Sequence, residues 1–274
     1  MDTRRVQRGP ARIAYAAWGH GPAVLLLASL GRGAEDFFEV APLIAAQGFR
    51  VLAPDPRGIG DSEGPMTGLT LYDLAEDAAA VLEAEGTGPA LVAGHAFGNW
   101  VARALSACRP ELVRGVVLLA ASITQNLDPA VRASIDGSFD PALSEAERLG
   151  HLQRGYFAPG HDARVWLTGW HPPVARMQRA ATAATDQRWR RCADRHATLY
   201  VAAALDTIAP VPTEAALREA LGDRVALTVI PDAGHALLPE QPAATAAAVV
   251  AFAGRADAAR HGRAEGPAIP RIGA

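Results

Sequence analysis

The amino-acid sequence predicts an α/β fold in which a mostly parallel, doubly wound sheet of about eight strands carries a helical cap insertion. Short apolar segments without polar alternation recur along the chain, which is typical of strands buried on both faces. Helix-like segments separate these strands, as the crossover connections of a parallel sheet require. The alternation stops at about residue 122 and resumes after residue 196, which indicates an inserted unit.

The strands are predicted from apolar runs bounded by turn residues. Residues 6–18 suit a hairpin, because Gly9-Pro10 supplies a turn between two segments of strand length. Residues 23–28 (AVLLLA) are apolar throughout. Further strands are expected at residues 50–53, 90–93, 115–121, 198–205 and 225–230.

The helices are predicted between these strands. Residues 36–47 place Phe37, Val40, Leu43 and Ile44 at helical spacing. Residues 70–85 are rich in Ala, Leu and Glu, which are good helix formers. The other helices of the repeating pattern are expected at residues 99–107, 213–221 and 242–253.

The inserted segment divides the chain. Residues 122–196 contain no strong strand pattern but hold several aromatic residues and prolines, so we interpret them as a helical cap. Residues 1–121 and 197–253 then form the core. Residues 254–274 are polar and rich in Gly and Pro, and we expect them to be a mobile tail.

Composition excludes several classes of function. The 274 residues include 26 Lys plus Arg against 29 Asp plus Glu, a formal net charge of −3, and half of them are hydrophobic. This balance is ordinary for a globular protein and supplies no basic field for nucleic acid or for a membrane surface. The expected partner is a small-molecule substrate, and a homodimer is left open.

All 26 cations are arginines, since the chain contains no lysine. This absence excludes a Schiff-base lysine and a phosphate-loop lysine. Two cysteines, Cys108 and Cys192, cannot form a disulfide framework or a cysteine-based zinc site. The N-terminus lacks the apolar stretch of a signal peptide, and no apolar run approaches the ~20 residues of a membrane span. We therefore expect a cytoplasmic location.

Asp206 and His235 each follow a predicted strand. The carboxyl ends of parallel strands meet at one edge of the sheet, where ligands bind, so the two side chains can lie together there. A carboxylate beside an imidazole fixes its tautomer and makes the other nitrogen a usable base. The competing interpretation is that Asp206 caps a helix starting near Val211 and that His235 is an ordinary loop histidine.

The segment Gly94-His95-Ala96-Phe97-Gly98 lies between a strand and a helix. Glycines at its two ends allow the sharp turn that raises the central residue above the sheet. The helix that follows directs its first N–H groups at this point, which favours developing negative charge.

These motifs resemble those of the α/β-hydrolase superfamily over about residues 6–253. The resemblance places the nucleophile elbow at residues 94–98, the acid at Asp206 and the histidine at His235, in the family's chain order. It also matches the Asp-x-Arg-Gly-x-Gly-x-Ser loop at residues 55–62. By this resemblance, the backbone N–H groups of Leu30 and Phe97 would form an oxyanion hole.

The chain departs from the family pattern at two places. Ala96 stands at the nucleophile position and has no hydroxyl, so no acyl-enzyme can form there. Ala28-Ser29 replaces the family's His-Gly after the third strand. The predicted function is therefore a cofactor-independent enzyme that acts on a small, fairly apolar organic substrate. It would use the Asp206–His235 dyad and a backbone oxyanion hole for proton transfer or water-activated hydrolysis.

Two alternatives stay open. The chain is either an esterase- or lactonase-type serine hydrolase inactivated by a Ser-to-Ala change at residue 96, natural or engineered, or a non-catalytic protein that binds a small ligand. A dinucleotide cofactor is not expected, because the partial Gly31-x-Gly33 pattern lacks its third glycine at Asp36. A metal is not expected either, because His161, Asp162 and His171 lack the i, i+4 spacing of a helical metal pair. The candidate pocket residues are Ser29, His95, Tyr156, Trp166 and Trp170.

Overall fold

The sheet determines where every other element lies. The computed structural model describes residues 1–123 and 128–264, and its eight strands follow the order β1-β2-β4-β3-β5-β6-β7-β8. β1 and β2 form an antiparallel hairpin, β2 is antiparallel to β4, and all other neighbours are parallel. This confirms the predicted fold class. The strands are β1 (Asp2–Arg8), β2 (Ala11–Trp18), β3 (Ala23–Leu27), β4 (Arg50–Pro54), β5 (Ala90–His95), β6 (Val113–Leu119), β7 (Thr198–Ala203) and β8 (Val225–Ile230).

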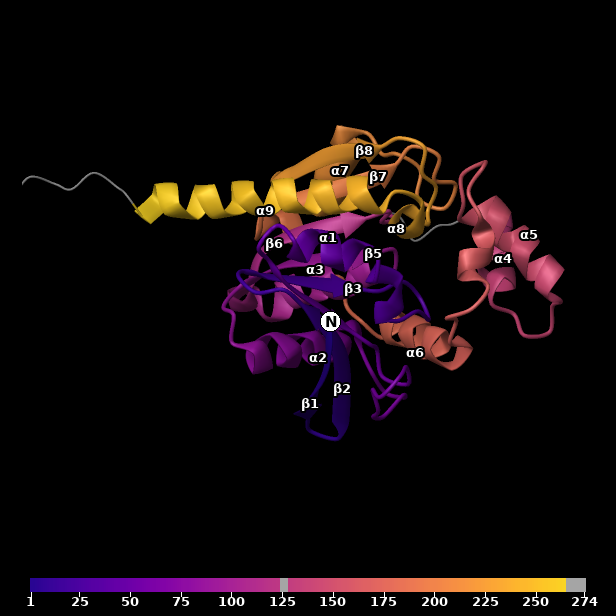
Figure 1. The fold of residues 1–274 in the computed structure, drawn as a ribbon, viewed down its shortest axis with the longest axis horizontal. Helices are drawn as coiled ribbons and strands as arrows, with labels where there is room; N and C mark the ends of the chain where they lie inside the picture. The colour runs from indigo at the N-terminus through magenta and orange to yellow at the C-terminus, as the bar shows by residue number, and fades with distance from the viewer. Residues whose placement is uncertain (124–127, 265–274) are drawn as a thin grey trace, which may run out of the picture.

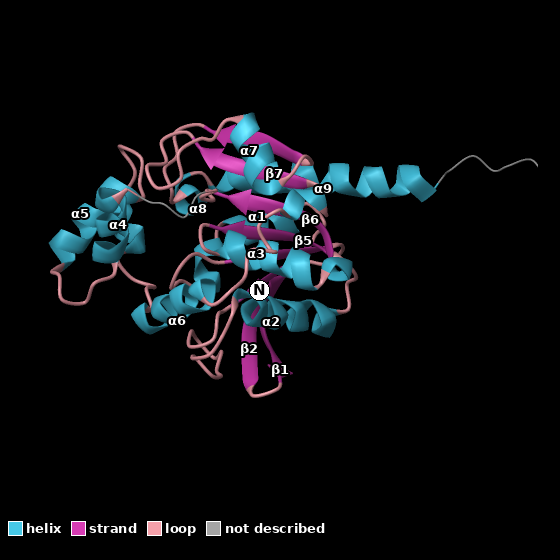
Figure 2. Ribbon diagram, turned by 180° about the vertical axis from the view of Figure 1, so that it is seen from behind, coloured by secondary structure: helices cyan, strands magenta, loops and turns pink. Residues whose placement is uncertain are grey.

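Helices cover both faces of the sheet (Figures 1 and 2). The α-helices are α1 (Val40–Ala45), α2 (Leu71–Glu85), α3 (Gly98–Cys108), α4 (Pro129–Ser138), α5 (Glu145–Gly155), α6 (Pro172–Ala183), α7 (Glu214–Leu221), α8 (Leu237–Glu240) and α9 (Pro242–Ala264). Short 3-10 turns are η1 (Ala34–Phe37), η2 (Pro110–Leu112), η3 (Ala163–Trp166) and η4 (Cys192–Asp194).

The central strand β3 shows why its sequence is apolar throughout. Leu25 and Leu27 point into the core cluster that includes residues of α2 and α3. Val24 and Leu26 point into the opposite cluster, which includes residues of α1 and α9. Because side chains alternate between faces and both faces are covered, no position along β3 suits a polar residue.

The segment predicted as a cap is helical. Between β6 and β7 lie α4, α5 and α6 with η3 and η4, and no strand occurs in residues 120–123 and 128–197. Figure 1 shows α4 and α5 beside the sheet edge, beyond α8, with α6 nearer to α2. The division of the chain into a core and a cap stays a prediction.

Two predicted elements have different limits in the structure. The helix expected at residues 36–47 is instead η1 followed by α1, and Leu43 is 41% exposed. Pro42 has no N–H to donate to the carbonyl of Phe38, so it is tolerated only in the first turn of a helix that begins at Val40.

The last helix extends past the predicted boundary at residue 253. α9 continues to Ala264 and projects beyond the sheet (Figure 1), because Ala and Arg favour helix strongly enough to outweigh Gly254. The expected mobile tail from residue 254 is therefore helical over its first eleven residues, Gly254–Ala264. Residues 265–274 lie outside the described part of the chain.

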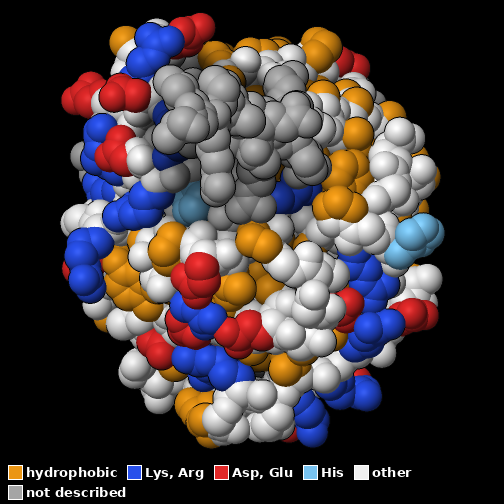
Figure 3. Space-filling model, turned by 90° about the vertical axis from the view of Figure 1, so that its left-hand side faces the viewer, with side chains coloured by type: hydrophobic (Ala, Val, Ile, Leu, Met, Phe, Trp, Pro, Cys, Tyr) orange, Lys and Arg blue, Asp and Glu red, His pale blue; other side chains and the backbone are white. Residues whose placement is uncertain are grey.

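The surface agrees with the near-neutral composition. Figure 3 shows one face on which arginine and acidic side chains are interspersed. Arg109, for example, pairs with Glu76 at 3.1 Å and with Glu111 at 2.7 Å. Within the described residues, no helix is both long and apolar enough to cross a membrane.

Candidate active site

The turn between β5 and α3 depends on two glycines. A Cβ atom at Gly94 would lie 2.2 Å from the carbonyl oxygen of Gly98, and one at Gly98 would lie 2.1 Å from the oxygen of Leu27. Both distances are far below van der Waals contact with backbone, which cannot move aside as a side chain can. The strand and helix therefore approach as closely as the predicted elbow requires.

Ala96 occupies the tip of this turn in the left-handed region, with φ of +46°. That conformation is unfavourable for a residue with a Cβ atom. It is held by hydrogen bonds on both sides: the Ala96 N–H donates to Leu119 over 3.0 Å, and the Asn99 N–H donates to the Ala96 carbonyl over 3.2 Å. Backbone strain of this kind is concentrated at functional sites.

Asp206 and His235 lie together. His235 Nδ1 is 2.9 Å from Asp206 Oδ2, and the two side chains are 5% and 0% exposed. The other oxygen, Oδ1, accepts from the N–H groups of Ile208 and Ala209, each over 2.8 Å. Asp206 does not cap α7, which begins at Glu214 after its own cap residue, Thr213. The carboxylate is thus oriented by two amides and leaves His235 Nε2 for other partners.

Glu240 holds the loop that carries His235. Glu240 Oε2 accepts from the Gly234 N–H over 2.7 Å, and Oε1 accepts from the Ala158 N–H over 2.6 Å. Burial raises the pKa of this carboxyl, against the lowering effect of the two backbone donors. Glu240 therefore joins the histidine loop to the segment between β6 and β7.

His95, a candidate pocket residue, lies against the His235 backbone and outside the cavity lining. Its side chain is fully buried, it does not line the cavity, and its Nε2 lies 2.8 Å from the His235 carbonyl oxygen. Burial lowers the pKa of His95 to about 3, and the neighbouring His235 acts in the same direction. The ring is therefore neutral, with Nε2 protonated so that it can donate to that carbonyl.

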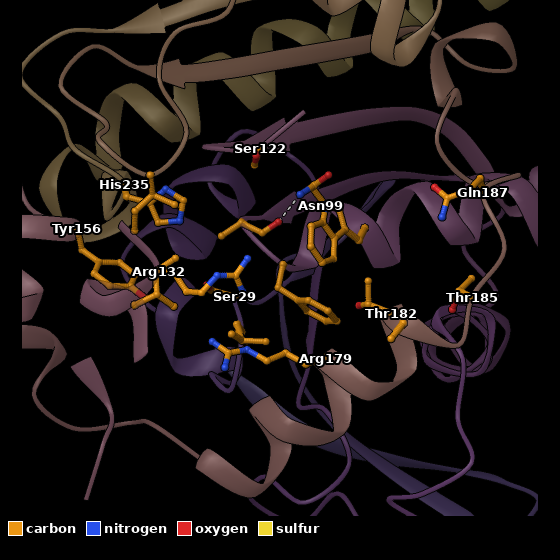
Figure 4. Close-up of a pocket in the computed structure, with 17 residues that line it drawn as sticks. Ser29, Asn99, Ser122, Arg132, Tyr156, Arg179, Thr182, Thr185, Gln187 and His235 are labelled. Carbon is orange, nitrogen blue, oxygen red and sulfur yellow. Dashed lines mark hydrogen bonds between the residues drawn. The ribbon is translucent and has the colours of Figure 1, made fainter. Parts of the chain in front are cut away.

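A cavity of about 470 Å³ opens above the elbow (Figure 4). Its lining includes Ser29, Leu30, Ala96, Phe97 and His235, which follow β3, β5 and β8. These residues come together because the carboxyl ends of parallel strands share one edge of the sheet. Asp206, after β7, lies behind His235 and does not line the cavity.

Leu30 and Phe97, the predicted oxyanion donors, both line the cavity. Phe97 is the N-cap of α3, where the helix leaves its first N–H groups unsatisfied. Next to Leu30, the Gly31 N–H donates to Gln178 Oε1 over 2.7 Å, and the Arg32 N–H donates to the Ser29 carbonyl over 3.2 Å. In the described ranges, neither Leu30 nor Phe97 has a hydrogen-bond acceptor for its N–H.

The aromatic candidates separate into two groups. Tyr156 lines the cavity, with its ring centroid 5.5 Å from that of His235. Trp166 and Trp170, also candidate pocket residues, do not line the cavity and pack against Tyr156 instead, with ring centroids 5.6 and 5.7 Å from its ring. The guanidinium of Arg32, which pairs with the buried Asp36, lies 4.6 Å from one indole ring and 4.7 Å from the other, so both rings pack against this cation.

Sequence reasoning missed most of the outer wall. These residues come from α3, from α4, and from α6 and the chain just after it; they are Asn99, Trp100, Arg132, Ile135, Arg179, Thr182, Ala183, Thr185 and Gln187. No local pattern separates them from residues of an ordinary amphipathic helix. Among the described residues, no group of three or more His, Cys, Asp or Glu side chains could hold a metal ion.

Comparisons with known proteins agree with this geometry. The model of the alpha/beta hydrolase family matches residues 8–248. "Putative carbamate hydrolase RutD" of Variovorax paradoxus is 31% identical over 234 residues, which cover 79% of this chain and 87% of that protein. "Putative non-heme bromoperoxidase BpoC" of Mycobacterium tuberculosis is 34% identical over 109 residues, a match that spans only 41% of its length.

Solved structures have the same fold. The crystal structure of a hydrolase from Pseudomonas aeruginosa superposes with a TM-score of 0.74 and 25% identity, covering 92% of this chain and 98% of that one. The crystal structure of BpoC from Mycobacterium tuberculosis has a TM-score of 0.73 and 25% identity, covering 89% and 96%. Fold, elbow geometry and family match agree, and the chain belongs to the alpha/beta hydrolase family.

Proposed function

We propose that this protein is a cofactor-independent enzyme in which His235 acts as a general base on a small organic substrate, without a covalent intermediate. One observation carries the proposal. His235, oriented by Asp206 over 2.9 Å, faces a cavity in which the nucleophile position is occupied by Ala96. The base is present, and the group that it would normally activate is absent.

Water-activated hydrolysis follows from this arrangement. His235 Nε2 takes a proton from a water molecule, and the resulting hydroxide adds to the substrate carbonyl carbon. The N–H groups of Leu30 and Phe97 stabilise the tetrahedral oxyanion. When the oxyanion collapses, the leaving group takes the proton back from His235. The names of the relatives, a carbamate hydrolase among them, support hydrolysis as the reaction class.

Abstraction of a proton from carbon uses the same groups. In this reaction His235 removes a proton next to a carbonyl, and the two N–H groups stabilise the enolate. The enolate then expels a leaving group from the neighbouring carbon, which takes the proton from His235, or it takes the proton back at another carbon, which gives an isomer. The substrate decides between water and carbon as the proton source, because the catalytic groups are common to both reactions. His235 is therefore the proposed base whether the proton comes from water or from carbon.

A serine-type acyl hydrolase with Ser changed to Ala at residue 96 is the second candidate. The specific observation in its favour is the intact elbow, with φ of +46° at Ala96 and no room for a Cβ at Gly94 or Gly98. Under this candidate, a fluorophosphonate probe would label Ala96→Ser at residue 96, and that variant would hydrolyse p-nitrophenyl esters. The unmodified chain would turn over no substrate.

The test compares the unmodified chain with His235→Ala on a panel of esters, lactones and carbonyl carbon acids. We expect the unmodified chain to turn over at least one substrate, to stay unlabelled by the probe, and to lose about 10²-fold or more of kcat in His235→Ala. His20→Ala, at an exposed histidine, is the matched control and should keep full activity. Equal activity of His235→Ala and His20→Ala contradicts the proposal. Labelling of the unmodified chain by the fluorophosphonate probe contradicts it as well. Ligand binding without any turnover, together with no labelling of Ala96→Ser by the probe, would instead indicate the non-catalytic binding protein.

A further inference from the structure

Two arginines from different helices line the cavity, and the proposed reaction does not use them. Arg132 belongs to α4 and Arg179 belongs to α6, 47 residues later in the chain. In Figure 4 their guanidinium groups lie on the same side of the view as His235 and Tyr156, away from Thr185 and Gln187. The two charges therefore lie at the end of the cavity that holds the proposed base.

The charge at this end is not balanced by the cavity wall. Among the described residues that line the cavity there is no Asp or Glu. Arg179 forms an ion pair with Asp136, but both side chains are nearly half exposed, and exposed pairs of this kind are weak. In the described part of the chain, no carboxylate lies within ion-pair distance of Arg132.

Other groups at this end add to the positive potential. Phe97, the N-cap of α3, lines the cavity together with Leu30, and neither residue's N–H has an acceptor among the described residues. The nearest acid of the site, Asp206, lies behind His235 and already accepts three hydrogen bonds. An anion in the cavity would meet several donors, and no carboxylate among the described residues lines the cavity wall, although Asp136 lies beside Arg179.

We infer that the substrate carries a carboxylate, which Arg132 binds with support from Arg179. A guanidinium matches a carboxylate through two parallel N–H···O bonds. A phosphate forms the same paired bonds with a guanidinium, but its greater charge calls for further cationic groups, and Arg179 is already shared with Asp136. The inference rests on the proposed function for the placement of the reacting group near His235.

The remaining cavity wall suits the rest of such a substrate. Trp100 and Phe97 offer aromatic surface, with ring centroids 5.8 Å apart. Thr182 and Gln187 offer hydrogen-bonding groups at the far end. The substrate class is thus a carboxylate with an apolar, ring-sized body, and its charged group lies near the reacting carbon.

The test uses 2-naphthoate and its neutral amide, 2-naphthamide, with binding measured by calorimetry. We expect the unmodified chain to bind the carboxylate at least 10-fold more tightly than the amide. Arg132→Gln should reduce this preference to less than twofold, and Arg179→Gln should reduce it by a smaller factor, because Asp136 already shares that charge. Arg176→Gln is the matched control: it is exposed on the same helix as Arg179 but does not line the cavity.

Two results would overturn the inference. One is no preference for the carboxylate in the unmodified chain, including no measurable binding of it. The other is an unchanged preference in Arg132→Gln, which would show that these are solvated surface arginines. Circular dichroism and thermal unfolding confirm that each variant is folded.

A binding readout keeps this inference separate from the proposed function. His235→Ala should retain the preference for the carboxylate, because the base does not hold the charge. If the unmodified chain prefers 2-naphthoate to 2-naphthamide but turns over no substrate, only the proposed reaction is refuted. If the chain turns over a substrate but does not prefer 2-naphthoate to 2-naphthamide, only the arginine site is refuted.

Discussion

His235 Nδ1 and Asp206 Oδ2 lie 2.9 Å apart although 29 residues separate them in the chain. The carboxylate holds the imidazole in one orientation and stabilises the imidazolium that forms when the ring takes a proton. Two backbone amides hold the carboxylate in turn. This chain of contacts is the basis of the first prediction.

Asp206→Asn should lower kcat about 10²-fold or more while the protein stays folded. The amide has nearly the same size but no charge to stabilise the imidazolium. Steady-state kinetics on a substrate of the unmodified chain provides the measurement. Asp223→Asn, at an exposed position, is the control and should leave kcat unchanged. Full activity in Asp206→Asn would remove the dyad from the mechanism.

Gly98→Ala should destabilise the fold by about 3 kcal/mol or more, because the new methyl group would lie 2.1 Å from the backbone oxygen of Leu27. Urea unfolding provides the free energy of unfolding. Gly254→Ala is the matched control: it lies in α9, its added Cβ meets nothing within 4 Å, and it should stabilise the helix by about 0.5–1 kcal/mol. Similar stabilities for the two variants would contradict the close approach at the elbow.

The stability of the protein should fall as the pH drops below about 6.5, and His95 should cause part of this loss. Its pKa in the folded state is about 3, so between pH 6.5 and 3 the unfolded chain binds one more proton than the folded chain. The stabilising contribution of neutral His95 is therefore complete above pH 6.5 and is lost towards pH 3. The slope from this residue approaches about 1.4 kcal/mol per pH unit.

His95→Gln removes this titration and keeps a donor for the His235 carbonyl. We expect a shallower fall of unfolding free energy between pH 7 and pH 5 than in the unmodified chain, measured by urea unfolding at several pH values. His20→Gln, at an exposed histidine, should retain the original slope. Parallel pH profiles for His95→Gln and the unmodified chain would show that His95 titrates normally in the fold.

Asp36→Ala should cost about 3–5 kcal/mol, because it leaves the buried guanidinium of Arg32 without its partner. Asp162→Ala breaks an exposed pair with Arg164 and should cost less than about 1 kcal/mol. Urea unfolding compares the two. Since Arg32 also lies between Trp166 and Trp170, Asp36→Ala should in addition alter the tryptophan fluorescence of the folded protein. Equal costs for the two substitutions would mean that the buried pair does not stabilise the fold.

The sequence by itself determined the sheet and the order of the motifs on it. Every position of β3 is apolar because side chains on both faces are covered, so the sequence has no polar alternation there. Gly94 and Gly98 are recognisable because a close approach of two backbones excludes any other residue. The apolar strand and the two glycines are local features of the sequence. The meeting of the motifs follows from the rule that the carboxyl ends of parallel strands lie at the same edge of a sheet.

Only the tertiary structure decided what surrounds the site. Trp166 and Trp170 are aromatic residues of the kind that line pockets, yet both pack against Arg32, more than 130 residues away in the chain, and neither lines the cavity. Arg132 and Arg179 have the pattern of ordinary helix-surface residues, yet α4 and α6 bring them to one cavity. Periodicity identifies a helix and its apolar face, but the partner of that face depends on packing between distant segments, which no local pattern records.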